Sequence, residues 1–219
     1  MRNLTAILCL TLAVLLGSAG MSWSADFQKG VDAYNRGDYA TALREWKPLA
    51  EQGNAPAQTN LGVMYAKGRG VPQNFETAMK LHTLAAEQGN VLAQFNLGLM
   101  YEDGHGVPKN YKTAVRWYRL GAEQGYARAQ SNLGAMYADG QGVLQDYVRA
   151  HMWFNIAASS GHENIMENVT VRRMGGVFIG FNKNAVTNRD IVAKRMTPAD
   201  ISAAQTLARE CVRKKYKEC

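Results

Sequence analysis

Few residues in this sequence of 219 have the types and spacing that catalysis or metal binding requires. The four histidines form no i, i+4 pair and have no carboxylate at metal-ligand spacing. They are His82, His105, His151 and His162. Ser-x-x-Lys, Gly-x-Ser-x-Gly and a phosphate-binding loop are absent from the sequence, which removes the usual nucleophilic and nucleotide-binding signatures. We therefore expect no catalytic residue, no metal site and no cofactor.

Two cysteines near the end of the chain can form a covalent link. Cys211 and Cys219 are eight residues apart, which on one helix would put their Cα atoms about 12 Å apart, beyond disulfide reach. A disulfide is the expected state in an oxidising compartment. The chain must then bend back after about Lys215.

The N-terminal segment indicates export. Arg2 precedes an uncharged apolar run from Leu4 to Leu16 and then small residues, which is the order found in a secretory signal. At about 13 residues, the run is short for a membrane span. We expect residues 1–24 to be a signal peptide. Cleavage after Ala19 is an alternative position. The competing interpretation of the segment is a buried N-terminal helix. The mature protein is then periplasmic or secreted, with no transmembrane segment.

The positive charge is concentrated at the C-terminus. Residues 25–164 hold 13 Lys and Arg against 13 Asp and Glu, whereas residues 165–219 hold 11 against 5. These cations could attract an acidic partner, a glycan or a membrane surface, or could simply be a solvated chain end. The cations concerned are Arg172, Arg173, Arg213, Lys214, Lys215 and Lys217. Nucleic acid is not an expected partner of an exported protein.

An internal repeat predicts the fold. Residues 53–88, 89–124 and 125–160 align without gaps at a period of 36, each with Ala-Gln-x-Asn-Leu-Gly-x-Met-Tyr followed by Gly-x-Gly-Val. A fixed period of this length is typical of solenoids, propellers or arrays. The apolar residues recur at helical spacing within each unit, so each repeat should be a helical hairpin.

The boundaries of these helices are also signalled. A glycine pair should end each first helix, and Asn74, Asn110 or Asp146 should cap each second helix. The repeated Gly62, Gly98 and Gly134 lie inside the first helices, where glycine costs about 1 kcal/mol relative to alanine. They need a compensating reason, and the close approach of a neighbouring helix supplies one.

The flanking segments are expected to close the stack. Residues 25–52 should form an N-terminal capping helix pair before the three repeats of residues 53–160. Residues 161–195 should be a fourth repeat, interrupted at 165–184 by an insertion whose paired glycines and β-branched residues favour a short hairpin or loop. Residues 196–219 should form a C-terminal capping helix and a basic tail.

The repeated motif closely resembles the Sel-one-like repeat (SLR) family, which is related to the tetratricopeptide repeat. The resemblance implies an all-α, right-handed α-solenoid of antiparallel helix pairs whose concave groove binds protein or peptide partners. It implies a non-enzymatic adaptor or regulator in the bacterial envelope. Some secreted members carry a β-lactamase label, so a hydrolase is an alternative. Anionic surface or glycan binding through the C-terminus is another. Cysteines eight residues apart also occur in a secreted branch of this family, which agrees with a disulfide that fixes the C-terminal end of the chain.

Residues that change between repeats on the outer side of the first helices are the candidate partner-binding residues. Phe95 and Leu99 are four residues apart and could form an apolar patch, or could equally pack against an adjacent helix. The repeated asparagine amides beside them could bind a peptide backbone. The complete set is Thr59, Phe95, Ser131, Leu99, Asn60, Asn96 and Asn132, and Val63 and Ala135 occupy the repeat positions equivalent to Leu99.

Overall fold

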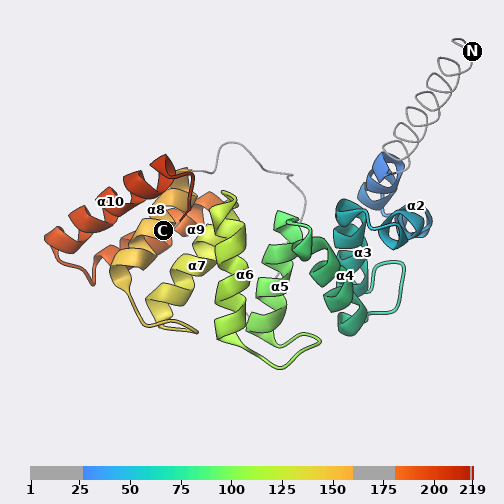
Figure 1. The fold of residues 1–219 in the computed structure, drawn as a ribbon, viewed down its shortest axis with the longest axis horizontal. Coiled ribbons are helices and arrows are strands. Elements are labelled where there is room, and N and C mark those ends of the chain that lie inside the picture. The colour runs from blue at the N-terminus through green and yellow to red at the C-terminus, as the bar shows by residue number, and fades with distance from the viewer. Residues whose placement is uncertain (1–26, 160–180, 218) are drawn as a thin grey trace, which may run out of the picture. The chain divides into compact units, whose positions relative to one another are not determined.

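A computed structural model describes residues 27–159, 181–217 and 219 of the chain. This part contains helices and no strands, beginning with a helix over residues 27–35 (Figure 1). The helices that follow are α2 (Tyr39–Glu51), α3 (Ala55–Lys67), α4 (Phe75–Glu87), α5 (Val91–Asp103), α6 (Tyr111–Glu123), α7 (Ala127–Asp139), α8 (Tyr147–Ser159), α9 (Phe181–Ala193) and α10 (Pro198–Arg213). Consecutive helices pack as pairs. The predicted all-α solenoid of repeats is confirmed.

The chain divides into two compact units at residue 90. In the first, α2 packs on α3 and α3 packs on α4, around a core that includes Trp46, Leu61 and Met64. In the second unit, each helix from α5 to α8 packs on the helix that follows it, so this series of contacts ends at α9. Its core includes Tyr118 and Trp153. Each unit therefore has its own buried apolar cluster.

Side-chain caps start the second helix of each repeat, as the sequence predicts. Asn74 accepts a hydrogen bond from the backbone N–H of Thr77 at 2.8 Å, and Asn110 accepts one from Thr113 at 3.0 Å. Asp146 does the same for Arg149 at 2.9 Å. These bonds satisfy N–H groups that have no partner inside the helix.

Glycine ends the first helix of each repeat. Gly68, Gly104 and Gly140 all have left-handed φ angles, between 65° and 78°. Such angles strain any residue that carries a Cβ atom. The reversal between the two helices of a repeat therefore depends on these glycines.

The repeated glycines inside α3, α5 and α7 allow close packing. A Cβ atom added at Gly98 would overlap the ring of Tyr118, and one at Gly62 would lie 2.7 Å from the ring of His82. In the next repeat, a Cβ at Gly134 would lie 3.0 Å from the ring of Phe154. The predicted close approach is confirmed: an aromatic ring from the second helix of each repeat lies against the glycine of the first.

The last helix covers one side of α8. α10 packs along α8 and buries Met152 and Ile156, each 2% exposed. The equivalent residues of the preceding repeat, Arg116 and Leu120, are exposed. Because α8 is covered on several sides, its sequence is apolar nearly all round rather than amphipathic.

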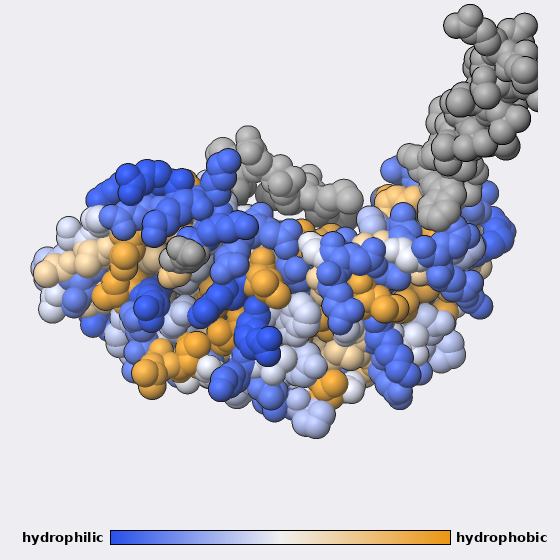
Figure 2. Space-filling model, in the orientation of Figure 1, coloured by the Kyte–Doolittle hydropathy of each residue, from blue (hydrophilic) through white to orange (hydrophobic). Residues whose placement is uncertain are grey.

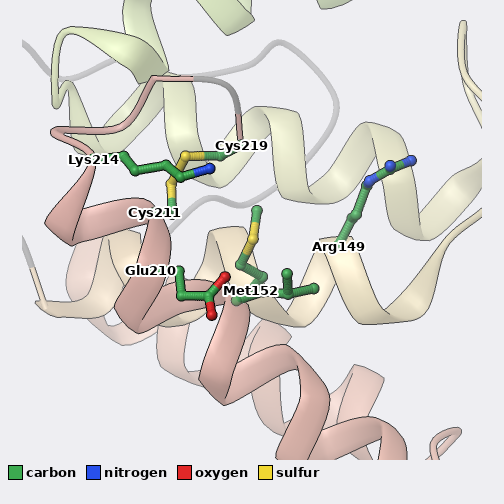
Figure 3. Close-up of a pocket in the computed structure, with 7 residues that line it drawn as sticks. Arg149, Met152, Glu210, Cys211, Lys214 and Cys219 are labelled. Atoms are coloured by element: carbon green, nitrogen blue, oxygen red, sulfur yellow. A yellow bond between two sulfur atoms is a disulfide. The ribbon is translucent and has the colours of Figure 1, made fainter.

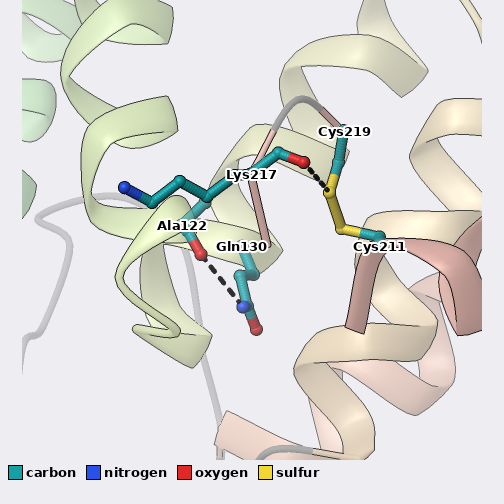
Figure 4. The surroundings of a disulfide bond; sticks show 5 residues. All are labelled: Ala122, Gln130, Cys211, Lys217 and Cys219. Atoms are coloured by element: carbon teal, nitrogen blue, oxygen red, sulfur yellow. Dashed lines mark hydrogen bonds between the residues drawn. A yellow bond between two sulfur atoms is a disulfide. The ribbon is translucent and has the colours of Figure 1, made fainter. Parts of the chain in front are cut away.

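A hook after α10 brings the two cysteines together (Figure 4). Lys215 and Tyr216 have left-handed φ angles of 53° and 65°, and the N–H of Tyr216 donates to the carbonyl of Cys211 at 2.8 Å. Cys211 and Cys219 form a disulfide with their Cα atoms 5.5 Å apart. The chain reverses where the cysteine spacing requires it to.

Two expectations fall wholly or partly outside the described residues. The signal peptide of residues 1–24 lies outside them, and so does most of the insertion at 165–184. The end of that insertion is described and is helical, because α9 begins at Phe181. Residues 181–184, which the sequence assigned to a hairpin or loop, therefore belong to the helix that carries the fourth set of repeat residues.

Candidate functional site

In the first helix of each repeat, the accessible residues lie at positions i, i+4, i+7 and i+11 and form a stripe along the helix. These spacings lie on one side of a helix. In α5 the stripe is Leu92, Asn96, Leu99 and Asp103, none of which is buried, whereas the residues between them mostly are. The equivalent residues of α7 are Arg128, Asn132, Ala135 and Asp139. α9 continues the stripe with Asn188 and Ile191, and Arg195 follows that helix.

The stripes of the second unit form rows of similar chemistry. One row has the amides of Asn96, Asn132 and Asn188. Beside it is an apolar row in which Ile191 is 48% exposed, and Leu99 and Ala135 are half-buried. Because α5 and α7 both pack on α6, and α7 and α9 both pack on α8, one extended segment can contact equivalent residues of successive helices. We call the residues of these stripes in α5, α7 and α9 the groove face.

Four of the predicted residues lie on such faces, and three do not. Asn60, Asn96, Asn132 and Leu99 are half-buried and accessible; Asn60 belongs to α3 of the first unit. Phe95, Thr59 and Ser131 are 5%, 2% and 8% exposed. A position directly before the asparagine is rotated by about 100° around the helix, and this turns it into the core.

Phe95 takes the second of the two placements that its spacing allowed. Its ring packs against Tyr118 at a centroid distance of 5.9 Å and against Tyr126 at 5.3 Å. Thr59 donates its hydroxyl to the carbonyl of Ala55 at 2.8 Å, so it too is used internally. Neither side chain is presented on the groove face.

A polar network lies beneath the groove face in the second unit. The hydroxyl of Tyr118 donates to a carboxylate oxygen of Glu102 at 2.5 Å, and Asn132 also hydrogen-bonds this hydroxyl. Burial, followed by the charge of Glu102, raises the pKa of Tyr118 well above its usual value. Tyr118 is thus a neutral donor that helps to fix Glu102 and Asn132.

Sequence reasoning missed Leu92, Asp103, Asp139 and Ile191. The signal was present, because positions 92, 96, 99 and 103 have the spacing of one helical face. The comparison of repeats singled out residues that vary, but variation alone does not distinguish an exposed position from a buried one. Phe95 differs from its repeat equivalents Thr59 and Ser131, yet all three side chains are buried in the core.

A cavity of about 250 Å³ lies beside the disulfide (Figure 3). Arg149 and Met152 of α8 line one side of it. Glu210, Cys211 and Lys214 line the other. Two cations and one carboxylate around this volume do not select a ligand of one sign. In the described residues, no three His, Cys, Asp or Glu side chains form a group that could hold a metal ion.

The surface of the second unit is mixed in hydropathy. On the face visible in Figure 2, hydrophobic residues form small separated areas among hydrophilic ones. Several of the large exposed hydrophobic side chains lie away from the groove face, among them Leu120 at 43% and Val212 at 47%. No helix of the described ranges is both long and apolar enough to cross a membrane.

Stacked helix pairs with a repeated accessible face define an α-solenoid repeat protein. The Sel1 repeat model matches residues 55–90, 91–126 and 127–162, with the 36-residue period expected from the sequence and a start shifted by two residues. The chain therefore belongs to the Sel1 repeat (SLR) family, whose members are generally protein–protein interaction scaffolds.

Two solved structures are similar to the chain. A Sel1 repeat protein from Oxalobacter formigenes is 40% identical with a TM-score of 0.59, and the match covers 62% of this chain and 54% of that one. A protective antigen with an SLR fold, present in uropathogenic Escherichia coli strains, is 28% identical with a TM-score of 0.52, covering 94% and 49%. The chain thus spans about half the length of both. No curated protein matches it significantly.

Proposed function

We propose that the protein is a non-enzymatic adaptor or regulator of the bacterial envelope that binds a segment of a partner protein on its groove face. The observation that supports this proposal is that the asparagine row and the apolar row lie side by side on successive helices. Asparagine amides can donate to and accept from a peptide backbone, and the adjacent apolar row can bury side chains of the same segment.

The alternative activity, hydrolysis, has less support. It requires a nucleophile or metal site; the sequence has none of the usual nucleophile motifs, and the described residues contain no group of three His, Cys, Asp or Glu side chains that could hold a metal ion. The buried His82 and His151 each have an Nδ1 atom without a hydrogen-bond partner in the described structure, but neither lies on the groove face or lines the cavity beside the disulfide. The signal-like order of residues in the N-terminal sequence supports the proposed envelope location.

The test compares two pairs of exposed apolar residues. Leu92→Asp/Ile191→Asp changes the groove face, where these side chains are 42% and 48% exposed. Leu120→Asp/Val212→Asp makes the same charge change at 43% and 47% exposed residues elsewhere in the second unit. Both variants should keep the helical circular dichroism of the parent, because surface substitutions seldom unfold a domain.

Partners are captured from envelope extracts with the parent and both variants. A protein retained by the parent and by the Leu120/Val212 variant, but lost with the Leu92/Ile191 variant, would support binding on the groove face. Equal retention by all three would contradict it. A partner lost with both variants would place the interaction on a wider surface.

A further inference from the structure

The hook that follows α10 is closed against the local preference of its backbone. Within the described residues, Lys215 and Tyr216 are the only non-glycine residues whose φ angles lie in the left-handed region. This region is disfavoured for any residue that carries a Cβ atom, and the turns of the repeats place glycine there. Other contacts must therefore keep these two consecutive residues in place.

The disulfide is the covalent contact that keeps the hook closed. The N–H of Tyr216 adds a hydrogen bond to the carbonyl of Cys211 at 2.8 Å, and the ring of Tyr216 lies against the turn at Gly125. The side chains of Lys215 and Lys217 are exposed, so they bury little apolar surface. Breaking the disulfide would leave the disfavoured backbone conformation to these non-covalent contacts alone.

The two cysteines of the disulfide differ in accessibility. Cys211 is 3% exposed, whereas Cys219 is half-buried. Both line the cavity of about 250 Å³ (Figure 3). Because access decides which sulfur atom a thiolate attacks, a reductant that enters this cavity should attack Cys219. Lys214 lines the same cavity, and a neighbouring cation stabilises the thiolate that leaves.

We propose that Cys211–Cys219 is a site of thiol–disulfide exchange with a dithiol reductant, and that its reduction opens the hook while the repeats stay folded. Accessible disulfides and those that close a strained loop are the ones that exchange most readily, and this disulfide combines both features. The proposal concerns the C-terminal end of the second unit and does not depend on binding at the groove face.

The exchange takes place in two steps. A thiolate of the dithiol attacks Sγ of Cys219 and forms a mixed disulfide with it. The bond between the two cysteines breaks, and its electron pair stays on Sγ of Cys211, which leaves as a thiolate. The second thiolate of the reductant then attacks the reductant sulfur of the mixed disulfide and releases Cys219 as a thiolate. The dithiol loses two electrons and becomes a disulfide, and the two cysteines gain them.

Two glycine substitutions in the hook test whether reduction relaxes its backbone. Lys215→Gly removes the disfavoured conformation from the closed hook, so it should shift the equilibrium about two- to fivefold toward the disulfide. Lys217→Gly is the matched control, because it removes the same charge at a residue without a left-handed φ angle. The control should shift the equilibrium about two- to fivefold toward the dithiol, since glycine gives the open hook more conformational freedom.

The equilibrium is measured on the full purified protein without denaturant. Parent and variants are incubated in mixtures of reduced and oxidised dithiothreitol, the free thiols are alkylated, and mass spectrometry gives the reduced fraction. Circular dichroism of each sample reports whether the helices remain folded.

Glutathione, a monothiol, traps the first step of the exchange. After a brief exposure of the oxidised parent to glutathione, the remaining thiol is alkylated. Mass spectrometry should then find glutathione on Cys219 and the alkyl group on Cys211.

Limited digestion with trypsin tests the opening of the hook, because trypsin cleaves after lysine. The reduced parent should be cleaved after Lys215 or Lys217 faster than the oxidised parent, with unchanged helical circular dichroism. Cys211→Ser/Cys219→Ser should be cleaved at the faster rate with or without the reductant.

Four results would each overturn the proposal. They are a disulfide that dithiothreitol reduces only after denaturant is added, glutathione found mainly on Cys211, shifts in the same direction for Lys215→Gly and Lys217→Gly, and a rate of tryptic cleavage in the hook that reduction leaves unchanged. The second would exclude the proposed site of attack, and the last two would exclude opening of the hook.

Discussion

The ring that packs against the repeated glycine belongs to a different residue type in each repeat. Positions 82, 118 and 154 are His, Tyr and Phe, and all three are buried against the glycine of the preceding helix. Tyr118 uses its hydroxyl to bond Glu102, and Phe154 needs no polar partner. His82 is 1% exposed, and its Nδ1 atom has no hydrogen-bond partner in the described structure.

His82 should make the stability of the protein depend on pH. Burial lowers the pKa of His82 to about 4, whereas an unfolded histidine titrates near 6.5. Below pH 6.5 the unfolded chain therefore binds a proton that the folded protein does not, so the free energy of unfolding falls as pH drops toward 4. Between pH 7 and 4.5 this one residue should account for about 2 kcal/mol.

His82→Phe tests this, because phenylalanine occupies the equivalent position in the third repeat. The variant should lose about 2 kcal/mol less than the parent between pH 7 and 4.5, measured by urea unfolding at each pH. Any packing change from the larger ring affects both pH values alike and cancels in the difference. Parallel pH curves for parent and variant would show that His82 is protonated equally in the folded and unfolded states.

At the scale of elements, α10 changes which residues α8 can carry. Met152 is 2% exposed beneath α10, whereas the equivalent Lys80 and Arg116 of the earlier repeats are exposed. Met152→Lys would bury a charge without a partner, and we expect it to lower the free energy of unfolding by about 3 kcal/mol or more. Arg116→Met is the matched reverse change and should alter stability by less than about 0.5 kcal/mol. Urea unfolding of both measures the difference; equal effects would mean that α10 does not cover α8 in solution.

The hook after α10 is the second element with a measurable role. Its disulfide closes a loop of about nine residues, so reduction should lower the free energy of unfolding by about 2–3 kcal/mol. Tyr216 lies in this loop, and its ring is 3.0 Å from where a Cβ atom of Gly125 would be. Thermal unfolding with and without a dithiol reductant measures the effect. Cys211→Ser/Cys219→Ser should be insensitive to the reductant, and a parent that is equally insensitive would exclude a stabilising disulfide.

At the scale of the whole molecule, the charge distribution separates two modes of binding. The net positive charge comes from the C-terminal quarter, whose described cations include Arg213, Lys214, Lys215 and Lys217. Attraction of polyanions to these residues would weaken steeply with salt, whereas apolar contacts on the groove face would not. Anionic surface or glycan binding through this end is the second proposal for the chain.

Retention on immobilised heparin tests that proposal. Replacing Arg213, Lys214, Lys215 and Lys217 by glutamine should lower the salt concentration at which the protein elutes, because these cations are clustered. The control replaces four exposed cations of the repeats and their N-terminal flank, Arg36, Lys47, Lys112 and Arg116, and should elute close to the parent. Identical elution of both variants would indicate attraction by net charge alone.

The sequence determined the helical repeats because their signals are local. The period of 36, the caps at Asn74 and Asn110, and the glycines that end each first helix all act within a few residues of chain. The asparagine row was also predictable, because an asparagine recurs at the same position of each repeat.

Only the tertiary structure decided which variable residues are accessible. Phe95 and Leu99 are one helical turn apart, yet Phe95 packs on Tyr118 and Tyr126 while Leu99 remains accessible on the groove face. Likewise, Met152 is buried because α10 returns to cover it. Burial depends on which helices pack around a residue, and helices far apart in the sequence settle this together.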